Sequence, residues 1–467
     1  MKRLFSYALA TAVALLYFSS ASQSQPVSSR QGIAPVAVHS KDGKVSGWKI
    51  VIPGGRPLAT PAISDGKMFV GGGFGSHEFY AFDAATGSLR WIYHTADDGP
   101  TAAVVSDGRI VFNTESCELE VITRDGKPLW KKWLGDPLMS MPAIAGGAVY
   151  MAFPNSRGDS KYYVAAFDLT SGKELWKNSI ASEIITAPVI DGDTVYLATV
   201  DGSLVAFDRR DGAKIWEETK NVTSAPAVWN GRCYFSRREA TLVSKNGSQV
   251  KQQNEMVAER AAGRSGKVKD FTATQRMADY LDYSKRAEAS SMERKSMLFD
   301  ASVGFGVTKG SANVAMMKTN LGQGTVHGIW AYQGSKPFVD RGRVYTSMGN
   351  TVISTDAESE IVLWKRTIDQ DKTVPLLDST LTPPAVVNGK VFVASSSGEV
   401  FALSADNGEV VWKLDVGEPV AFQPAISGGK IYIATNNGNV YCFETGDPRD
   451  DGWQMWGATS SHNGLSR

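Results

Sequence analysis

The residues that most often do chemistry in proteins are few and scattered in this chain of 467 residues. It contains five histidines and three cysteines, and the spacings CxxC, CxxCH and HExxH do not occur. Their absence excludes zinc-ribbon, c-type haem and zincin sites. His94 precedes Asp97 and Asp98, but one such loop is weak evidence for a metal site. The histidines have no compelling catalytic partners, so a hydrolase or lyase is the weakest interpretation. We expect no catalytic residue and no metal site.

A second set of polar residues stands just before apolar segments that recur along the chain. Its members are Arg56, Asp97, Asp98, Asp136, Glu183, Thr223, Gln333, Asp378 and Glu418. Most are acidic and only one is basic. If these positions share one face, that rim is negative, which would repel an anionic cofactor and favour a cation or a basic peptide. The alternative is that they are solvated turn residues with no binding role.

The polar residues of this set stand at the start of repeated units, so the fold of the repeat decides where they lie. One unit opens at Pro188, passes through an apolar run that ends at Asp208, and closes at Gly212 and Trp216. The opening proline recurs at intervals of roughly 40 residues, which indicates one structural unit repeated. It stands at Pro61, Pro142, Pro188, Pro226, Pro337, Pro384 and Pro424, with Ala102 near the place of a missing one. The closing tryptophan recurs at Trp91, Trp130, Trp176, Trp216, Trp364 and Trp412.

Each unit carries four β signals separated by turns such as Asp65-Gly66 and Asn437-Gly438. Four short antiparallel strands per repeat describe one blade of a β-propeller. Counting the opening segments predicts an all-β, eight-bladed propeller of four-stranded antiparallel blades over residues 46–467. We interpret the repeated tryptophans as a girdle packed between blades, not as a binding stack. A strand around Trp48 should complete the final blade.

One long gap interrupts the repeats in the fifth blade. Residues 252–325 lack the repeat pattern and predict an insertion. Thr272 to Gln275 resembles a capping box, and the following residues up to Leu298 avoid Pro and Gly, which predicts a helix. The insertion is interpreted either as an arm or lid that binds a partner, or as a tolerated surface excursion.

The three cysteines differ in their predicted surroundings. Cys233 and Cys442 align with core positions of other repeats, whereas Cys117 takes the place of a turn glycine. We therefore expect Cys117 to be the exposed thiol.

The N-terminus predicts export. Lys2 and Arg3 precede an apolar run and then small residues, so residues 1–24 are interpreted as a signal peptide and residues 25–45 as a linker. No later run is long and apolar enough to cross a membrane. The formal net charge of +1 gives no global field that would attract nucleic acid. The mature protein is expected to be periplasmic or extracellular and soluble, and its oligomeric state is not indicated.

Three runs share the pattern AxDxxxGxxxW: Ala81 to Trp91, Ala166 to Trp176, and Ala206 to Trp216. They resemble the PQQ-like β-propeller repeat, and the tail from Trp453 to Gly464 resembles a segment common in such exported propellers. The resemblance covers nearly all of 46–467. It implies either a quinoprotein dehydrogenase or a non-catalytic scaffold similar to the propeller lipoprotein of the outer-membrane assembly machinery. Residues 1–24 contain no cysteine that could be acylated.

Two functions follow from this resemblance. The first is an exported, non-catalytic propeller that binds a protein partner in the cell envelope and needs no cofactor. The alternative is an alcohol or sugar dehydrogenase that uses pyrroloquinoline quinone (PQQ) with Ca²⁺. The alcohol dehydrogenase branch places two adjacent cysteines over the quinone, whereas Cys117, Cys233 and Cys442 are far apart in this sequence.

Overall fold

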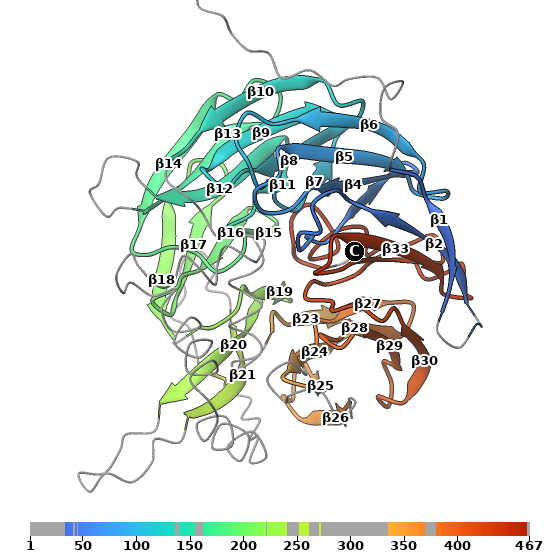
Figure 1. The fold of residues 1–467 in the computed structure, drawn as a ribbon. Helices are drawn as coiled ribbons and strands as arrows, with labels where there is room; N and C mark the ends of the chain where they lie inside the picture. Colours follow the sequence, from blue (N-terminus) through green and yellow to red (C-terminus); the bar gives the residue numbers. More distant parts are fainter. Residues whose placement is uncertain are drawn as a thin grey trace, which may run out of the picture.

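The computed structural model describes residues 33–40, 43, 45–135, 140–154, 162–220, 222–240, 252–260, 270–271, 335–368 and 380–464. The described strands form antiparallel sheets arranged around a central channel (Figure 1). Within each sheet, strands that are consecutive in sequence pair antiparallel. Each sheet begins with an inner strand of three residues whose first two are apolar and buried or half-buried, as in β7 (Val104–Ser106) and β11 (Ala143–Ala145).

Seven sheets have four strands. They comprise β3 (Ala62–Ser64), β4 (Lys67–Gly71), β5 (Glu78–Asp83) and β6 (Leu89–His94) in the first blade; β7 (Val104–Ser106), β8 (Arg109–Asn113), β9 (Glu118–Thr123) and β10 (Pro128–Trp133) in the second; β11 (Ala143–Ala145), β12 (Ala148–Pro154), β13 (Tyr162–Asp168) and β14 (Glu174–Ile180) in the third; and β15 (Val189–Asp191), β16 (Thr194–Ala198), β17 (Ser203–Asp208) and β18 (Lys214–Thr219) in the fourth.

The remaining blades follow the same order. They comprise β19 (Ala227–Trp229), β20 (Arg232–Ala240), β21 (Gln252–Arg260) and β22 (Asp270–Phe271) in the fifth; β23 (Phe338–Asp340), β24 (Arg343–Met348), β25 (Thr351–Asp356) and β26 (Val362–Thr367) in the sixth; and β27 (Ala385–Val387), β28 (Lys390–Ala394), β29 (Glu399–Ser404) and β30 (Val410–Asp415) in the seventh. The closing sheet contains β31 (Ala425–Ser427), β32 (Lys430–Ala434) and β33 (Asn439–Glu444) together with β2 (Ser46–Val51) and β1 (Val36–His39).

The closing sheet joins the two ends of the chain. β2 pairs antiparallel with β33, from Gly47 opposite Phe443 to Val51 opposite Asn439. β1 then pairs with the outer edge of β2, so this sheet has five strands. The N-terminal strand therefore closes the ring and covers the edge that β33 would otherwise expose.

Two parts of the predicted architecture need correction. We expected eight blades of four strands, but only seven sheets have that form, because β1 adds a fifth strand to the closing sheet. Residues 252–260, which we placed at the start of the insertion, form β21 and pair with β20 along its whole length. The helix predicted over 272–298 lies outside the described residues, and the described part of the chain contains no helix. Nor does it contain a helix that could span a membrane.

Tryptophans on the outermost strands join neighbouring blades. Trp176 on β14 packs against Gly212 of the fourth blade, where an added Cβ would lie 2.5 Å from the indole Cδ2. Its Nε1 donates a hydrogen bond to the Arg209 carbonyl at 2.9 Å. Trp48, Trp91, Trp130 and Trp364 donate equivalent bonds to the blade that follows each of them. Each of these pairs buries an aromatic ring between two blades.

Candidate functional site

The C-terminal segment, residues 453–464, lies at the centre of the ring (Figure 1). It crosses the inner strands near the turns that lead to the second strand of each blade, and we call this side the tail face. The middle residues of four inner strands donate backbone hydrogen bonds of 2.6 to 3.0 Å to this segment. The pairs are Ile426 with Trp453, Ile63 with Gln454, Ile144 with Ser460, and Ile190 with Ser461.

A side chain makes the corresponding contact with the fifth blade. The Val228 amide donates to Asn463 Oδ1 at 2.7 Å, and Asn463 Nδ2 donates to the Val228 carbonyl at 3.0 Å. The tail therefore ties together the inner strands of five blades.

The channel next to the tail holds two buried basic side chains. His462 lies between the carbonyls of Pro142 and Trp456, with both N···O distances at 2.9 Å. Burial lowers the pKa of His462 to about 4. Lys336 Nζ donates to the Pro226 carbonyl and lies 5.1 Å from the centre of the Phe338 ring. Burial also lowers the pKa of Lys336, to about 7. The channel therefore favours the neutral form of both side chains over the protonated form.

The opposite side of the propeller, the loop face, carries the loops that enter each blade. There the loop containing Asp97 and Asp98 meets the turn at Glu115 and Ser116. Asp97 accepts hydrogen bonds from the Ser116 amide at 2.8 Å and hydroxyl at 2.9 Å, and Glu115 Oε1 accepts one from the Gly75 amide at 2.9 Å. Burial, helped by the charges of Asp98 and Asp97, raises the pKa of Glu115 to about 7. We call Asp97, Asp98 and Glu115 the acidic cluster.

A buried carboxyl group lies near this cluster, between the first and second blades. Glu120 on β9 is only 1% exposed and accepts a hydrogen bond of 2.5 Å from the Tyr93 hydroxyl. Its Oε1 atom is buried and has no hydrogen-bond partner among the described residues. Burial raises the pKa of Glu120 to about 7, and the charges of Glu118 and Asp97 act in the same direction.

The structure brings only some residues of the predicted rim close together. Asp97 and Asp98 belong to the acidic cluster, and Glu183 lies close enough to act with Asp97 on the pKa of Cys117. Thr223 is buried, with its amide bonded to the Ser236 carbonyl. Arg56 donates to the Pro53 carbonyl at 3.3 Å. Asp136, Gln333 and Asp378 lie outside the described residues.

Glu418 is bound within the fold. It accepts hydrogen bonds from Lys49, Thr435, Asn439 and Tyr441 at 2.6 to 2.9 Å. Burial would raise the pKa of Glu418, but the bonds from Asn439, Tyr441 and Lys49 outweigh it and lower the pKa to about 2. Because Lys49 is on β2, this carboxylate helps join the N-terminal strand to the closing sheet.

The prediction of an exposed Cys117 is wrong. The residue adopts the turn conformation of the glycine it replaces, with φ of 57°, but its side chain is fully buried. The same position in the seventh blade, Gly398, shows why, because a Cβ there would lie 2.7 Å from the backbone of Glu418 in the loop entering the next blade. This turn therefore faces a neighbouring loop instead of solvent. Cys117, Cys233 and Cys442 are all buried.

Sequence reasoning missed the residues at the two ends of the channel. Lys336 had a usable signal, because it precedes Pro337 where other units have Ala187 or Ala225. A lysine at a position that is uncharged in the other units marks an exception in the channel lining. His462, Glu115 and Glu120 gave no comparable signal, since their surroundings come from segments distant in sequence.

The described channel residues do not fit PQQ. A tricarboxylate needs several cationic partners, whereas Lys336 is already bound to the Pro226 carbonyl and is surrounded by Phe338 and Trp456. The described residues also include no group of three His, Cys, Asp or Glu side chains that could hold a metal ion such as Ca²⁺.

Comparisons with known proteins bear on the fold and the family. The family profile described as outer membrane protein assembly factor BamB matches residues 34–161, 118–302 and 377–465. No match was found among curated protein sequences.

Solved structures share the fold at low sequence identity. BamB from Moraxella catarrhalis is 15% identical with a TM-score of 0.54, and the match covers 88% of this chain and 100% of that one. A quinohemoprotein alcohol dehydrogenase from Pseudomonas putida HK5 is 16% identical with a TM-score of 0.51, over 86% of this chain and 76% of that one. Sqt1 from Saccharomyces cerevisiae is 10% identical with a TM-score of 0.54, over 84% and 96%. At these identities the structural likeness shows the fold alone.

Proposed function

The chain belongs to the family of outer membrane protein assembly factor BamB, and from this premise we propose that it is an exported, non-catalytic propeller that binds a protein partner in the cell envelope. The observation that carries the proposal is the contrast between the two faces. The chain's own tail occupies the tail face, whereas the loop face presents the acidic cluster. A partner with a basic segment fits that cluster by charge.

The acidic cluster is suited to binding because its charges repel one another. Asp97 and Asp98 both raise the pKa of Glu115, and Asp97 and Glu183 both raise the pKa of Cys117. A lysine or arginine brought into this region would relieve that repulsion, so we expect binding that weakens as salt is added.

The test compares two variants that each lose three carboxyl groups, on opposite faces. Asp97→Asn, Asp98→Asn and Glu115→Gln together remove the acidic cluster. The matched control combines Asp107→Asn, Asp211→Asn and Glu409→Gln, which are exposed turn residues on the tail face. Binding of a Lys/Arg-rich peptide is measured by titration at low and physiological salt, and envelope partners are captured by crosslinking.

We expect the wild type and the control variant to bind the basic peptide and to capture the same partner. The cluster variant should bind the peptide at least tenfold more weakly and lose the partner. Equal binding by the two variants would show that the acidic cluster is not the docking site.

The second candidate function is a PQQ-dependent alcohol or sugar dehydrogenase. The observation that favours it is the fold shared with the quinohemoprotein alcohol dehydrogenase. Reconstitution with PQQ and Ca²⁺, followed by dye reduction with alcohols and sugars, separates the two candidates. Sustained turnover would replace the scaffold function, whereas we expect none.

Export belongs to the same proposal. If residues 1–24 are a signal peptide, the protein recovered from the envelope should begin close to Gln25. N-terminal sequencing of that protein tests this directly, and recovery of a chain that starts at Met1 would contradict it.

A further inference from the structure

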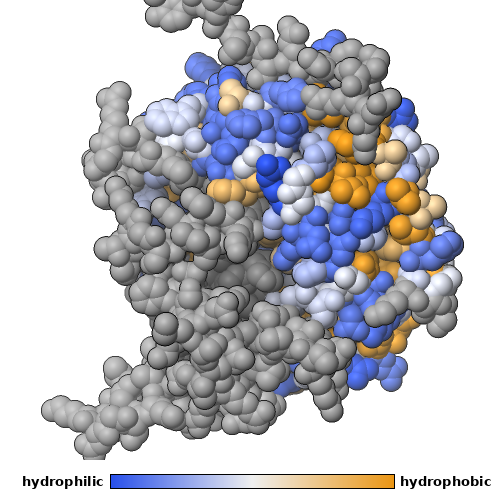
Figure 2. Space-filling view, viewed as in Figure 1, coloured by the Kyte–Doolittle hydropathy of each residue, from blue (hydrophilic) through white to orange (hydrophobic). Residues whose placement is uncertain are grey.

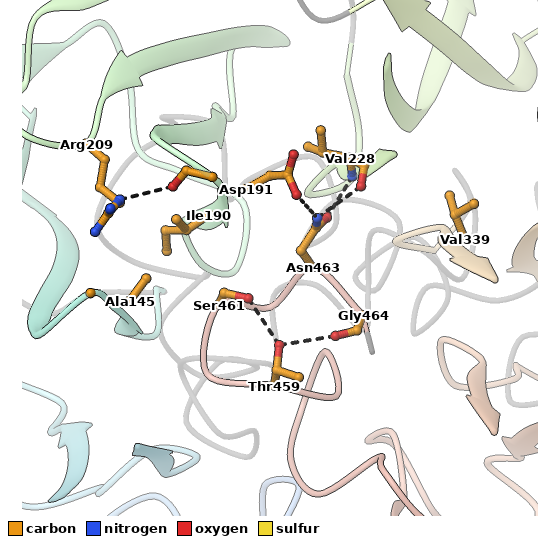
Figure 3. Close-up of a pocket in the computed structure, with 12 residues that line it drawn as sticks. Ala145, Ile190, Asp191, Arg209, Val228, Val339, Thr459, Ser461, Asn463 and Gly464 are labelled. Carbon is orange, nitrogen blue, oxygen red and sulfur yellow. Dashed lines mark hydrogen bonds between the residues drawn. The ribbon is translucent and has the colours of Figure 1, made fainter. Parts of the chain in front are cut away.

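A cavity of about 360 Å³ lies on the tail face, beside the C-terminal segment (Figure 3). Its walls are the ends of inner strands β11, β15, β19 and β23, which belong to four consecutive blades. The tail supplies Thr459, Ser461, Asn463 and Gly464 to the lining. This volume lies near the lower end of the range of ligand pockets, roughly 300 to 1,000 Å³.

Two groups of opposite charge share the pocket. Asp191 stands at the end of β15 and is exposed, and its Oδ1 accepts a hydrogen bond from Asn463 at 3.1 Å. Arg209 comes from the outer turn of the same blade, and its Nε donates to the Gly192 carbonyl at 3.0 Å. Figure 3 shows both side chains fixed by these bonds. Arg209 is also paired with Asp193, which lies outside the lining, at 3.3 Å. Two carboxylates and one guanidinium leave at most one net negative charge at this place, so an anionic ligand gains nothing there.

Hydroxyl groups continue the polar side of the pocket. Ser461 and Thr459 hydroxyl oxygens lie 3.1 Å apart, and Thr459 donates to the Gly464 carbonyl at 3.1 Å. Because these groups are already ordered by hydrogen bonds within the protein, binding of a ligand would cost little conformational entropy here. Ala145, Ile190, Val228 and Val339 add a smaller apolar part to the lining.

We propose that this pocket binds a neutral sugar of mono- or disaccharide size. Sugar hydroxyls both donate and accept, so they can meet the carboxylate of Asp191, the guanidinium of Arg209 and the hydroxyl of Ser461 at once. The C–H face of a sugar ring supplies apolar surface for the half-buried Val339. The site lies on the face opposite the acidic cluster, so it is independent of the proposed partner binding.

The test fills the pocket at one position and uses the equivalent position of another blade as a control. Ala145 and Ser106 both end an inner strand and pair with the residue that starts the next one. Only Ala145 lines the pocket. Trp229 occupies the equivalent position in the fifth blade, which shows that the fold accepts a large ring there. The variants are therefore Ala145→Phe and Ser106→Phe, with Asp191→Ala as a second test of the polar side.

The probes are cellobiose, maltose, sucrose and N-acetylglucosamine, with glucuronate and glucosamine as charged analogues. Binding is measured by saturation-transfer NMR and calorimetric titration on the full chain, and folding of each variant by thermal unfolding. We expect at least one neutral sugar to bind to the wild type and to Ser106→Phe with equal affinity. Ala145→Phe and Asp191→Ala should each weaken that binding at least tenfold.

Three results would overturn the proposal: no neutral sugar binds to the wild type, a charged analogue binds more tightly than every neutral sugar, or the two pocket variants bind as the wild type does. If Ala145→Phe fails to fold, Asp191→Ala decides the matter alone. Binding of the basic peptide to the loop face is measured in the same samples. Failure of the sugar site therefore remains distinguishable from failure of the proposed partner binding.

Discussion

The two faces of the propeller use charged and polar residues in opposite ways. In the channel beside the tail, Lys336 and His462 are buried bases that the fold holds against backbone carbonyls and the ring of Trp456. On the loop face, Glu115 and Glu120 are buried or half-buried acids, and further acids lie beside them. Figure 2 shows hydrophilic residues over most of the described part of the face in view, with an apolar area on the side of β1 and β2.

The contrast indicates that polar residues beside the tail stabilise the fold, whereas those of the acidic cluster are available for binding. The tail segment is bonded to five blades, so most of its contacts serve closure of the ring. The acidic cluster is bonded mainly to backbone amides and hydroxyls, which stabilise the carboxylates without neutralising them. The carboxylates of the acidic cluster are not paired with cations among the described residues, so they can bind a partner. The polar groups of the tail segment are bonded to the blades, so the tail face offers a cavity instead of free charge.

The largest expected effect tests whether the tail is part of the core. Trp453 is 1% exposed and pairs with Ile426, and its ring packs edge-on against Phe338 at 4.7 Å. Trp453→Ala should lower the free energy of unfolding by about 3–5 kcal/mol, as for buried aromatic residues generally. Trp133→Ala is the control, because Trp133 is 56% exposed. Denaturant titration measures both, and equal effects would mean that the tail is not structural.

The next prediction removes the buried amine of Lys336 in the channel beside the tail. The pKa of Lys336 is lowered to about 7 from an ordinary value of 10.5, so folding favours the neutral amine. The folded state therefore binds fewer protons than the unfolded state below pH 10.5, and stability falls as pH decreases towards 7. Lys336→Met should stabilise the protein by roughly 2–3 kcal/mol at pH 6, after loss of the bond to Pro226. The gain should vanish near pH 10.5.

Thermal or denaturant unfolding from pH 6 to 10 measures this effect. A gain that does not depend on pH would show that Lys336 is charged in the folded protein at every pH tested.

The loop face should show the opposite pH dependence. The pKa of Glu120 is raised to about 7, so folding favours the protonated acid and stability falls as pH rises from about 4.5 through 7. Glu120→Gln keeps a neutral partner for Tyr93 and should be more stable than the wild type above pH 8, by up to roughly 3 kcal/mol. At pH 4 the two proteins should be equally stable.

Tyr93→Phe serves as the control for this prediction. It removes a hydrogen bond that lowers the pKa of Glu120, so the fall in stability should still begin near pH 4.5 but continue to a higher pH than in the wild type. Unfolding curves between pH 4 and 9 provide the measurement. A slope unchanged in Glu120→Gln would mean that Glu120 does not titrate in this range.

The repeats made much of the fold predictable, because each strand and turn is encoded within a short segment. Asp65-Gly66 and Asn388-Gly389 form turns with positive φ as their types require, and the strand around Trp48 closes the ring. The faces were harder to predict because their contacts join residues far apart in sequence. His462 meets Pro142 across the channel, and Glu120 meets Tyr93 of another blade. Periodicity places a residue on a strand, but it does not reveal which loop covers it.

The smallest expected effect concerns two buried cysteines with different backbones. Cys117 has φ of 57°, a conformation that glycine adopts without strain, whereas Cys233 lies within β20. Cys117→Gly should therefore change stability by less than about 1 kcal/mol, because relief of backbone strain offsets the lost burial of the thiol. Cys233→Gly gains no such relief, and it loses thiol burial while placing a glycine inside a strand, so it should cost about 2 kcal/mol.

Denaturant titration of the two variants gives both values. Thiol counting in the native wild type should find no rapidly reacting site, since all three cysteines are buried. A cost for Cys117→Gly as large as that for Cys233→Gly would show that the loop entering the third blade depends on the thiol itself. The turn at Glu115 would then be held by side-chain packing as well as by its backbone, and the loop face would be as firmly built as the tail face.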